Sequence, residues 1–191
     1  GRDAYPLTCL MALWDYTAEP LYLDFARQTA GRLLATQLPD GGFGGQAGAG
    51  TMSGTSCLTG PESISFGSGL LAPLAFLEWA IRDDRRPSDF CDRLRRWADL
   101  MLRLQPADGI WLNGGSKGTP YTLIGAAALF SMVKASQILG DPRYAGAVRK
   151  YLSTMNAAKD CVHGTHSFLS AQYAHVADAE LDRTATGDRG A

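Results

Sequence analysis

Residues 121–155 read YTLIGAAALFSMVKASQILGDPRYAGAVRKYLSTM, and this stretch decides the fold class. The part at 121–139 is apolar nearly all round a helix, whereas 144–155 places charged residues on one helical face. A helix that is apolar on every side is buried, and an amphipathic helix covers a core. Gly140 ends a helix well, and Pro142 suits a first helical turn. The stretch therefore predicts a hairpin of one inner and one outer helix.

The same pair of helices is predicted twice more toward the N-terminus. Each short inner-to-outer joint carries a proline, and an aromatic residue follows at Tyr22, Phe90 and Tyr144. The first two outer helices end in related corners, QLPDGGF at 37–43 and QPADGIW at 105–111. Such a repeat, of roughly 50–70 residues, is typical of helical arrays and toroids. We predict helices at 5–17, 21–36, 68–82, 88–104, 121–139, 143–156 and 166–181.

These elements predict an all-α fold, an αα-hairpin array that forms a partial (α/α) toroid over residues 1–181. Residues 182–191 are expected to be a disordered tail. Three and a half hairpins are too few to close a ring. The chain is therefore expected to self-associate or to complete a larger chain, unless the array is open, because an uncapped array exposes apolar faces. Trp14, Phe76, Leu129 and Phe130 should be buried, and Arg95, Arg103 and Arg149 should face water.

Charge and hydropathy exclude two classes of partner. The net charge of the 191 residues is −1, and the arginines near residue 90 alternate with aspartates. Mixed charge at this spacing is typical of a solvated helix face, so nucleic acid is not an expected partner. No apolar run reaches the ~20 residues that cross a bilayer, so a membrane is not expected either.

The outer-to-inner connections are longer and rich in glycine. They span 41–69 and 108–120, and both precede an inner helix. Long loops in compact domains are often functional. Because the N-termini of the inner helices carry partial positive charge at this end, the connections predict a site for acidic or hydroxyl-rich ligands.

The helix alternation, the Q-x-x-D-G-x-[FW] corners and the LGDPRY joint at 139–144 together resemble the six-hairpin glycosidase and polysaccharide-lyase toroids. The resemblance implies a carbohydrate-active enzyme that cleaves an oligo- or polysaccharide by hydrolysis or elimination, with the substrate at the loop end and no cofactor. Residues 37–45 also resemble the repeats of terpene cyclases and protein prenyltransferase β-subunits, although the chain has no Asp-rich acid motif. A third hypothesis is a non-catalytic helical array that binds a partner.

Four residues near the inner-helix starts are candidate catalytic groups. Glu62 could act as a general acid or base, or could be a helix-start residue favoured by the dipole. Histidine side chains ordinarily titrate near neutrality, so His163 and His166 could serve in proton transfer or sugar contact; otherwise they are loop or capping residues. Tyr121 could form the proton-transfer pair of a β-eliminating lyase with a histidine, or only pack its ring.

The set Cys161-x-His163-x-x-His166 is compact, but it offers only three ligands at irregular spacing, so no metal is expected. Lanthionine cyclase toroids hold zinc with a histidine that directly follows a cysteine, whereas here Val162 intervenes. Cys9 and Cys91 lie in helical patterns, where a free cysteine behaves as a small hydrophobe. Pairing of Cys57 with Cys161 is left open.

Three residues of the corners are candidates for substrate binding. Phe43 and Trp111 could stack on sugar faces, or could fill the core of the hairpin. Asp108, which matches Asp40 in the repeat, could contact substrate as a carboxylate. In the alternative interpretation both aspartates make tight Asp-Gly turns, with the side chain bonded to its own backbone.

Overall fold

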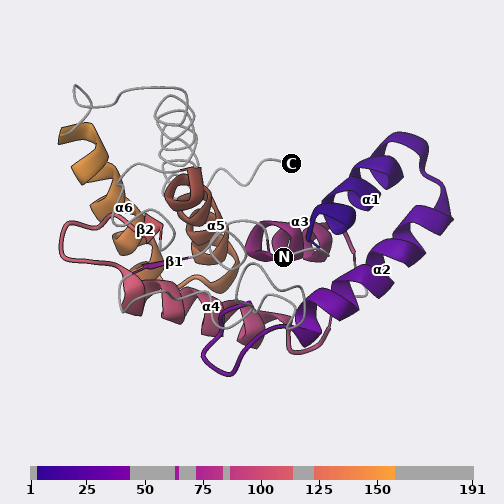
Figure 1. The fold of residues 1–191 in the computed structure, drawn as a ribbon, viewed down its shortest axis with the longest axis horizontal. Helices are drawn as coiled ribbons and strands as arrows, with labels where there is room; N and C mark the ends of the chain where they lie inside the picture. The colour runs from indigo at the N-terminus through magenta and orange to yellow at the C-terminus, as the bar shows by residue number, and fades with distance from the viewer. Residues whose placement is uncertain (1–3, 44–62, 65–71, 84–86, 114–122, 158–191) are drawn as a thin grey trace, which may run out of the picture.

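The structure is a computed structural model that describes residues 4–43, 63–64, 72–83, 87–113 and 123–157. Most of these residues are helical, so the predicted all-α class is confirmed, and six of the seven predicted helices are present. The seventh, at 166–181, and the tail at 182–191 lie outside the described residues. The elements in chain order are α1 (Ala4–Thr17), α2 (Pro20–Ala35), β1 (Ser63–Ile64), α3 (Ala72–Arg82), α4 (Phe90–Leu104), β2 (Leu112–Asn113), α5 (Leu123–Leu139) and α6 (Pro142–Ala157) (Figure 1).

The helices form two curved layers. In Figure 1, α2, α4 and α6 follow the convex side, and α1, α3 and α5 lie inside that curve. The inner helices are in contact along the chain order, because α1 packs on α3 and α3 packs on α5. The inner helices α1 and α5 pack on α2 and α6, the outer helices that follow them. Helices that alternate along the sequence therefore separate into an inner and an outer layer in space.

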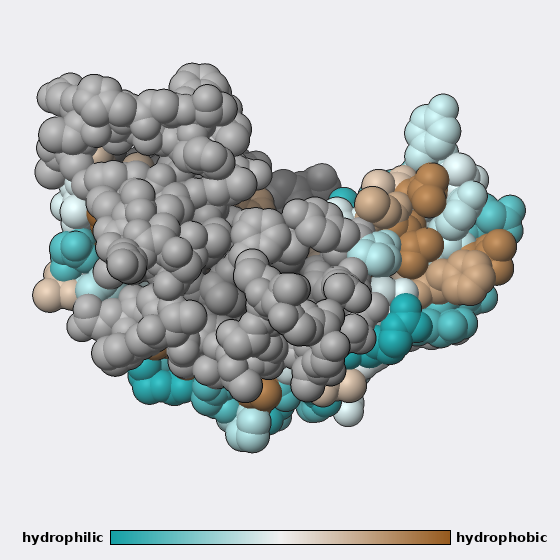
Figure 2. Space-filling model, in the orientation of Figure 1, coloured by the Kyte–Doolittle hydropathy of each residue, from teal (hydrophilic) through white to brown (hydrophobic). Residues whose placement is uncertain are grey.

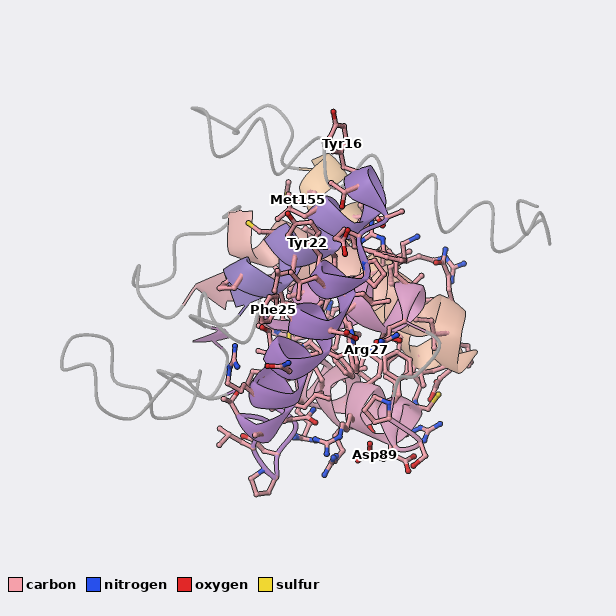
Figure 3. The ribbon with its side chains drawn as sticks, turned by 90° about the vertical axis from the view of Figure 1, so that its right-hand side faces the viewer. Tyr16, Tyr22, Phe25, Arg27, Asp89 and Met155 are labelled. Atoms are coloured by element: carbon pink, nitrogen blue, oxygen red, sulfur yellow. The ribbon has the colours of Figure 1, made fainter. Side chains whose placement is uncertain are left out.

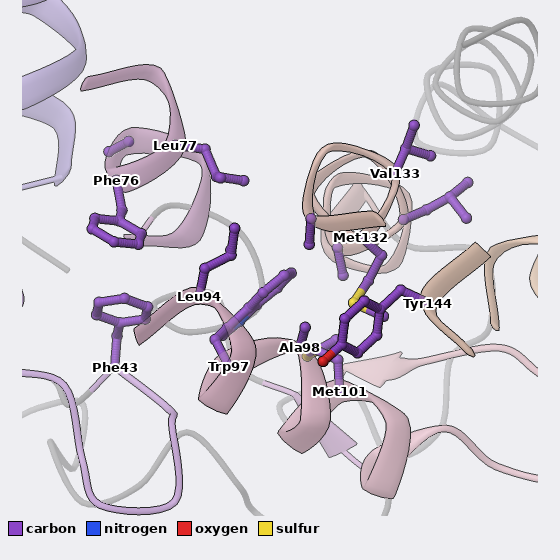
Figure 4. Close-up of a cluster of buried hydrophobic side chains, with 14 of the residues drawn as sticks. Phe43, Phe76, Leu77, Leu94, Trp97, Ala98, Met101, Met132, Val133 and Tyr144 are labelled. Carbon is purple, nitrogen blue, oxygen red and sulfur yellow. The ribbon is translucent and has the colours of Figure 1, made fainter. Parts of the chain in front are cut away.

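The outer helices bury one face, as their amphipathic pattern predicts. In α4, Leu94, Trp97 and Met101 are buried at helical spacing, and each contributes about 2 kcal/mol of hydrophobic stabilisation. Arg95, Arg103 and Arg149 are exposed, as predicted. Figure 4 shows Trp97 between Phe43 and Phe76 on one side and Met132 and Tyr144 on the other. The core therefore runs continuously between the layers.

The expected burial of single residues holds only in part. Phe76 and Leu129 are buried, as predicted. Trp14 is half-buried, and so is Phe130, whose ring lies 5.6 Å from Nζ of Lys134. The ammonium group of Lys134 therefore lies over the Phe130 ring at a cation–π distance.

The α1 helix is not buried all round, although its apolar sequence is typical of an inner helix, and this exposure is what an uncapped array is expected to show. Leu7 and Met11 are buried, but the exposed fraction is 42% for Leu13 and 90% for Tyr16. Cys9 is exposed as well, and so is Cys91 of α4, so neither cysteine contributes to the core. An apolar helix is buried all round only when it has neighbours on every side, and α1 packs on α2 and α3.

A partly buried ion pair joins α2 to the end of α3. The Asp83 carboxylate, which follows α3, accepts hydrogen bonds from Nε of Arg27 at 2.9 Å and from its Nη2 at 3.2 Å. The indole Nε1 of Trp79 donates to the same carboxylate at 3.0 Å. The bond to Asp83 raises the pKa of Arg27, so the guanidinium stays charged. Three donors on one buried carboxylate fix how α2 and α3 cross.

Candidate functional site

The first corner turn attaches α2 to α4. After α2 ends, Nε2 of Gln37 donates to the carbonyl of Gly41 at 3.1 Å and to the carbonyl of Arg93 on α4 at 2.9 Å. The backbone N–H of Gly42 donates to Oδ1 of Asp40 at 2.9 Å. Gly41 has φ +99°, a conformation that residues with a side chain rarely adopt. One amide side chain thus closes the turn and holds the next outer helix.

The second corner repeats this geometry between α4 and α6. Nε2 of Gln105 donates to the carbonyl of Gly109 at 2.9 Å and to the carbonyl of Ala147 on α6 at 2.8 Å. The N–H of Ile110 donates to Oδ1 of Asp108 at 3.0 Å, and Gly109 has φ +88°. The repeat of the sequence is therefore a repeat of structure in which each corner docks on the next outer helix.

Polar side chains of α4 and α6 also donate hydrogen bonds to the carbonyls of the corners. Nη2 of Arg103 donates to the Asp40 carbonyl at 3.1 Å, and Nζ of Lys150 donates to the Pro106 carbonyl at 3.1 Å. The hydroxyl of Thr154 donates to the carbonyl of Asp108. Cationic donors suit this place, because the C-terminus of a helix carries partial negative charge and free carbonyls.

The turn interpretation of the two aspartates is confirmed. Asp40 and Asp108 each accept a hydrogen bond from the backbone two residues later, and each precedes a glycine with positive φ. Asp108 is exposed. A contact between its carboxylate and a substrate stays a prediction.

Phe43 and Trp111 lie in the core. The exposed fractions are 1% for Phe43 and 0% for Trp111. The Phe43 ring packs on Phe76 at a centroid distance of 6.0 Å, and Trp111 stacks on Tyr151 at 5.5 Å. The indole N–H of Trp111 donates to the Met101 carbonyl at 2.9 Å. A sugar would first have to displace these partners, so the burial fits the alternative interpretation that both rings fill the hairpin core.

The first two outer-to-inner connections lie side by side. β1 and β2 form a parallel pair in which Ser63 is opposite Leu112 and Ile64 is opposite Asn113. The pair therefore brings the residue after Glu62 next to the residue after Trp111. Convergence of a third connection on this place stays a prediction, because Glu62, Tyr121, His163 and His166 lie outside the described residues.

Metal and membrane features can be assessed only for the described ranges. Among those residues, no group of three or more His, Cys, Asp or Glu side chains is arranged to hold a metal ion. The set Cys161, His163 and His166 lies outside them, as does Cys57. Within the same ranges, no helix has both the length and the apolar character needed to cross a bilayer.

Sequence reasoning missed a polar cluster between α4 and α6. The Tyr144 hydroxyl donates to Oδ1 of Asp99 at 3.0 Å, and Arg143 bonds both Asp99 and Asp141. Burial, together with the bond to Asp99, raises the pKa of Tyr144 to about 12. The side-chain bond from Arg143 lowers the pKa of Asp141. The LGDPRY joint contains three of these four residues, but Asp99 is far away in the sequence.

The raised pKa of Tyr144 predicts a loss of stability in alkali. The folded pKa lies above the ordinary value of 10.0. The protonated phenol therefore stabilises the fold below about pH 10, and this contribution is lost as the pH rises through about 12. Circular dichroism melting at rising pH should show a steeper loss of stability between these values for the wild type than for Tyr144→Phe. Parallel profiles would contradict the assignment.

Comparisons with protein family models, with curated proteins and with solved structures found no match. A function is therefore proposed from the residues and contacts described above.

Proposed function

We propose that this chain is part of a hairpin array of the α/α-toroid type that cleaves glycosidic bonds of an oligo- or polysaccharide. The observation that supports the proposal is the pairing of β1 with β2, which joins two outer-to-inner connections next to Glu62. In a hairpin array such connections all fall at one end, where the inner helices begin. Residues that are far apart in the sequence then share one site.

The candidate groups suit both ways of breaking a glycosidic bond. In hydrolysis, Glu62 protonates the leaving oxygen while a second group activates water. In elimination, a histidine or Tyr121 removes the proton beside the sugar carboxyl group, a C=C bond forms, and the C–O bond breaks as its oxygen gains a proton. The partial positive charge at the inner-helix N-termini favours an acidic sugar, which is the substrate that elimination requires.

The test is cleavage of neutral and acidic polysaccharides by the assembly in which the chain is active. New reducing ends report either reaction, and ultraviolet absorbance of unsaturated sugar ends reports elimination alone. Glu62→Ala, Tyr121→Ala and His166→Ala should each lower kcat/KM by about 10²–10⁴-fold, the usual contribution of a general acid or base.

The matched control is Arg149→Ala, an exposed residue of α6 that should leave kcat/KM unchanged. Unchanged activity in all three candidate variants would disprove the assigned roles. Activity lost equally in Arg149→Ala would show that the losses come from misfolding.

A second candidate function is a non-catalytic domain that binds a partner. It is favoured by the open flank, the exposed side of the first hairpin that consists of Cys9, Leu13 and Tyr16 of α1 and Leu21, Phe25 and Gln28 of α2. Figure 2 shows hydrophobic residues gathered at this end of the molecule. Exposed apolar residues that gather in one place mark interaction sites more often than scattered ones do. A partner bound without any product would support this candidate over the enzyme.

A further inference from the structure

The three outer helices share one register. The N–H of Tyr22 donates to the carbonyl three residues before it, at Glu19, and Phe90 and Tyr144 make the same bond at the starts of α4 and α6. The aromatic residue thus marks the same place in each first turn. Three residues later along each helix are Phe25, Arg93 and Ala147.

Two of these three positions receive a corner. The carbonyl of Arg93 accepts the amide of Gln37, and the carbonyl of Ala147 accepts the amide of Gln105. Because the register is shared, the carbonyl of Phe25 is the corresponding acceptor on α2. The exposed fraction is 46% for Phe25 and 5% for Ala147, so the position on α2 is open where the position on α6 is covered.

The place on the helix backbone against which the corner glycine packs is also repeated. A Cβ on Gly41 would meet the backbone of Arg96, and a Cβ on Gly109 would meet the backbone of Lys150. Arg96 and Lys150 lie three residues after the Gln acceptors. The residue three after Phe25 is Gln28, and Gln28 is exposed. The α2 helix therefore has the carbonyl of Phe25 and the backbone of Gln28 at the same spacing as the corresponding contact positions of α4 and α6.

An exposed apolar stripe also lies on α1, the helix that packs on α2. Cys9, Leu13 and Tyr16 recur at helical spacing on the side of α1 away from Leu7 and Met11, which are its buried residues. In Figure 3, α1 and α2 face the viewer, with Tyr16 and Phe25 on this side of the molecule. The α3 helix, by contrast, has α1 on one side and α5 on another.

We propose that the open flank binds an αα-hairpin unit from outside this chain whose outer helix ends in a Gln-x-x-Asp-Gly-aromatic corner. The Gln amide would donate to the Phe25 carbonyl, and the corner glycine would pack on the backbone of Gln28. A second copy of the chain is a poor donor, because its Gln37 and Gln105 corners hold its own α4 and α6.

Charge at the flank is complementary to this partner. The carbonyls at a corner lie at the negative end of a helix dipole, and Arg103 and Lys150 donate to them in the two internal joints. The α2 helix has exposed Arg32 one turn after Gln28, at the place where α6 uses Thr154 to bond the Asp108 carbonyl. Arg32, whose Nη2 donates to Oγ1 of Thr29 at 3.1 Å, therefore places a positive charge where the partner's corner would lie.

The test adds the expected partner to the whole chain. In an extended variant, a second copy of residues 4–71 is inserted directly before Ala4. The copied corner then precedes α1 at the same spacing at which the native corner precedes α3. Cys9→Ser in the copy leaves one Cys9 thiol, on the original flank. Alkylation of Cys9 is followed by peptide mass spectrometry, with exposed Cys91 of α4 as the internal reference.

Docking should slow the alkylation of Cys9 relative to Cys91 by at least about tenfold, because a tethered unit acts at an effective concentration near millimolar. Gly41→Ala in the copy, whose Cβ would overlap the acceptor backbone, should abolish the protection. Leu13→Lys on the original flank should abolish it too, without change in helix content.

Two results would overturn the proposal. The first is an alkylation rate of Cys9 that is the same in the extended variant as in the unextended chain. Protection of Cys9 that is unchanged when the copy carries Gly41→Ala would count against the proposal in the same way. The second is protection of Cys9 in the unextended chain that grows with concentration together with a dimer mass, since this would assign the flank to a second copy.

Discussion

Gly41→Ala is expected to destabilise the chain by about 3 kcal/mol or more. Gly41 has φ +99°, and an added Cβ would overlap the carbonyl of Arg96 and lie 2.8 Å from the backbone nitrogen of Trp97. Left-handed backbone costs a residue with a side chain about 1–3 kcal/mol. The overlap is with helix backbone, which cannot rotate away, so the corner must also leave α4 and lose the bond from Gln37 to the Arg93 carbonyl.

Substitutions at two other glycines separate the cost of backbone strain from the cost of the overlap with α4. Gly140 has φ +67°, and a Cβ added there would have no neighbour within 4 Å, so Gly140→Ala should cost only the backbone strain of about 1–2 kcal/mol. Gly31 lies within α2 with open space around it, so Gly31→Ala should stabilise by about 0.5–1 kcal/mol. Urea unfolding of the three variants gives the comparison. Equal losses for Gly41→Ala and Gly140→Ala would mean that the corner does not dock on α4.

Asp83→Ala is expected to have the second large effect, about 3 kcal/mol, the lower end of the usual cost of breaking a buried ion pair, because the Arg27 side chain that remains is 22% exposed. The substitution leaves the guanidinium of Arg27 without its bidentate partner and the indole N–H of Trp79 without its acceptor. It also leaves a cavity next to Trp79, which is itself buried. The expected result is a lower midpoint of urea unfolding with an unchanged slope.

The matched control removes the other carboxylate that Arg27 contacts. Asp24 bonds Nη1 of Arg27 at 3.0 Å, but its side chain is 62% exposed. Asp24→Ala should therefore change stability by less than about 0.5 kcal/mol. Similar losses for Asp24→Ala and Asp83→Ala would show that burial does not strengthen the bond between α2 and α3.

The local features of this fold could be predicted from its sequence, because they depend on patterns within one helix or one turn. The amphipathic pattern of α4 predicts which face is buried, and Asp-Gly predicts turns with positive φ at Gly41 and Gly109. Burial of α1 could not be predicted in this way. Its pattern shows that Leu13 and Tyr16 are apolar, but not whether a neighbour covers them.

Contacts across long sequence separations gave no local pattern. Arg27 and Asp83 are 56 positions apart, and nothing near either residue indicates the other. The docking of Gln37 on Arg93 is equally distant, and only its repetition at Gln105 and Ala147 makes it recognisable. Convergence of the candidate catalytic residues is also a contact between distant parts of the sequence. It depends on how three connections pack, so no local pattern could predict it.

The measurement that tests the central claim most directly is the distance between residues 62 and 166. Spin labels on Glu62→Cys and His166→Cys, with the four native cysteines changed to serine, give this distance by double electron–electron resonance. The control pair joins Glu62→Cys to Ile138→Cys, an exposed residue in the last turn of α5.

Convergence of the connections at one end predicts a 62–166 distance below about 20 Å. The 17 residues of α5 span about 25 Å at 1.5 Å per residue, so labels at opposite ends would be at least that far apart. The control pair should show this longer distance. A 62–166 distance as long as the control would contradict a shared site at the loop end.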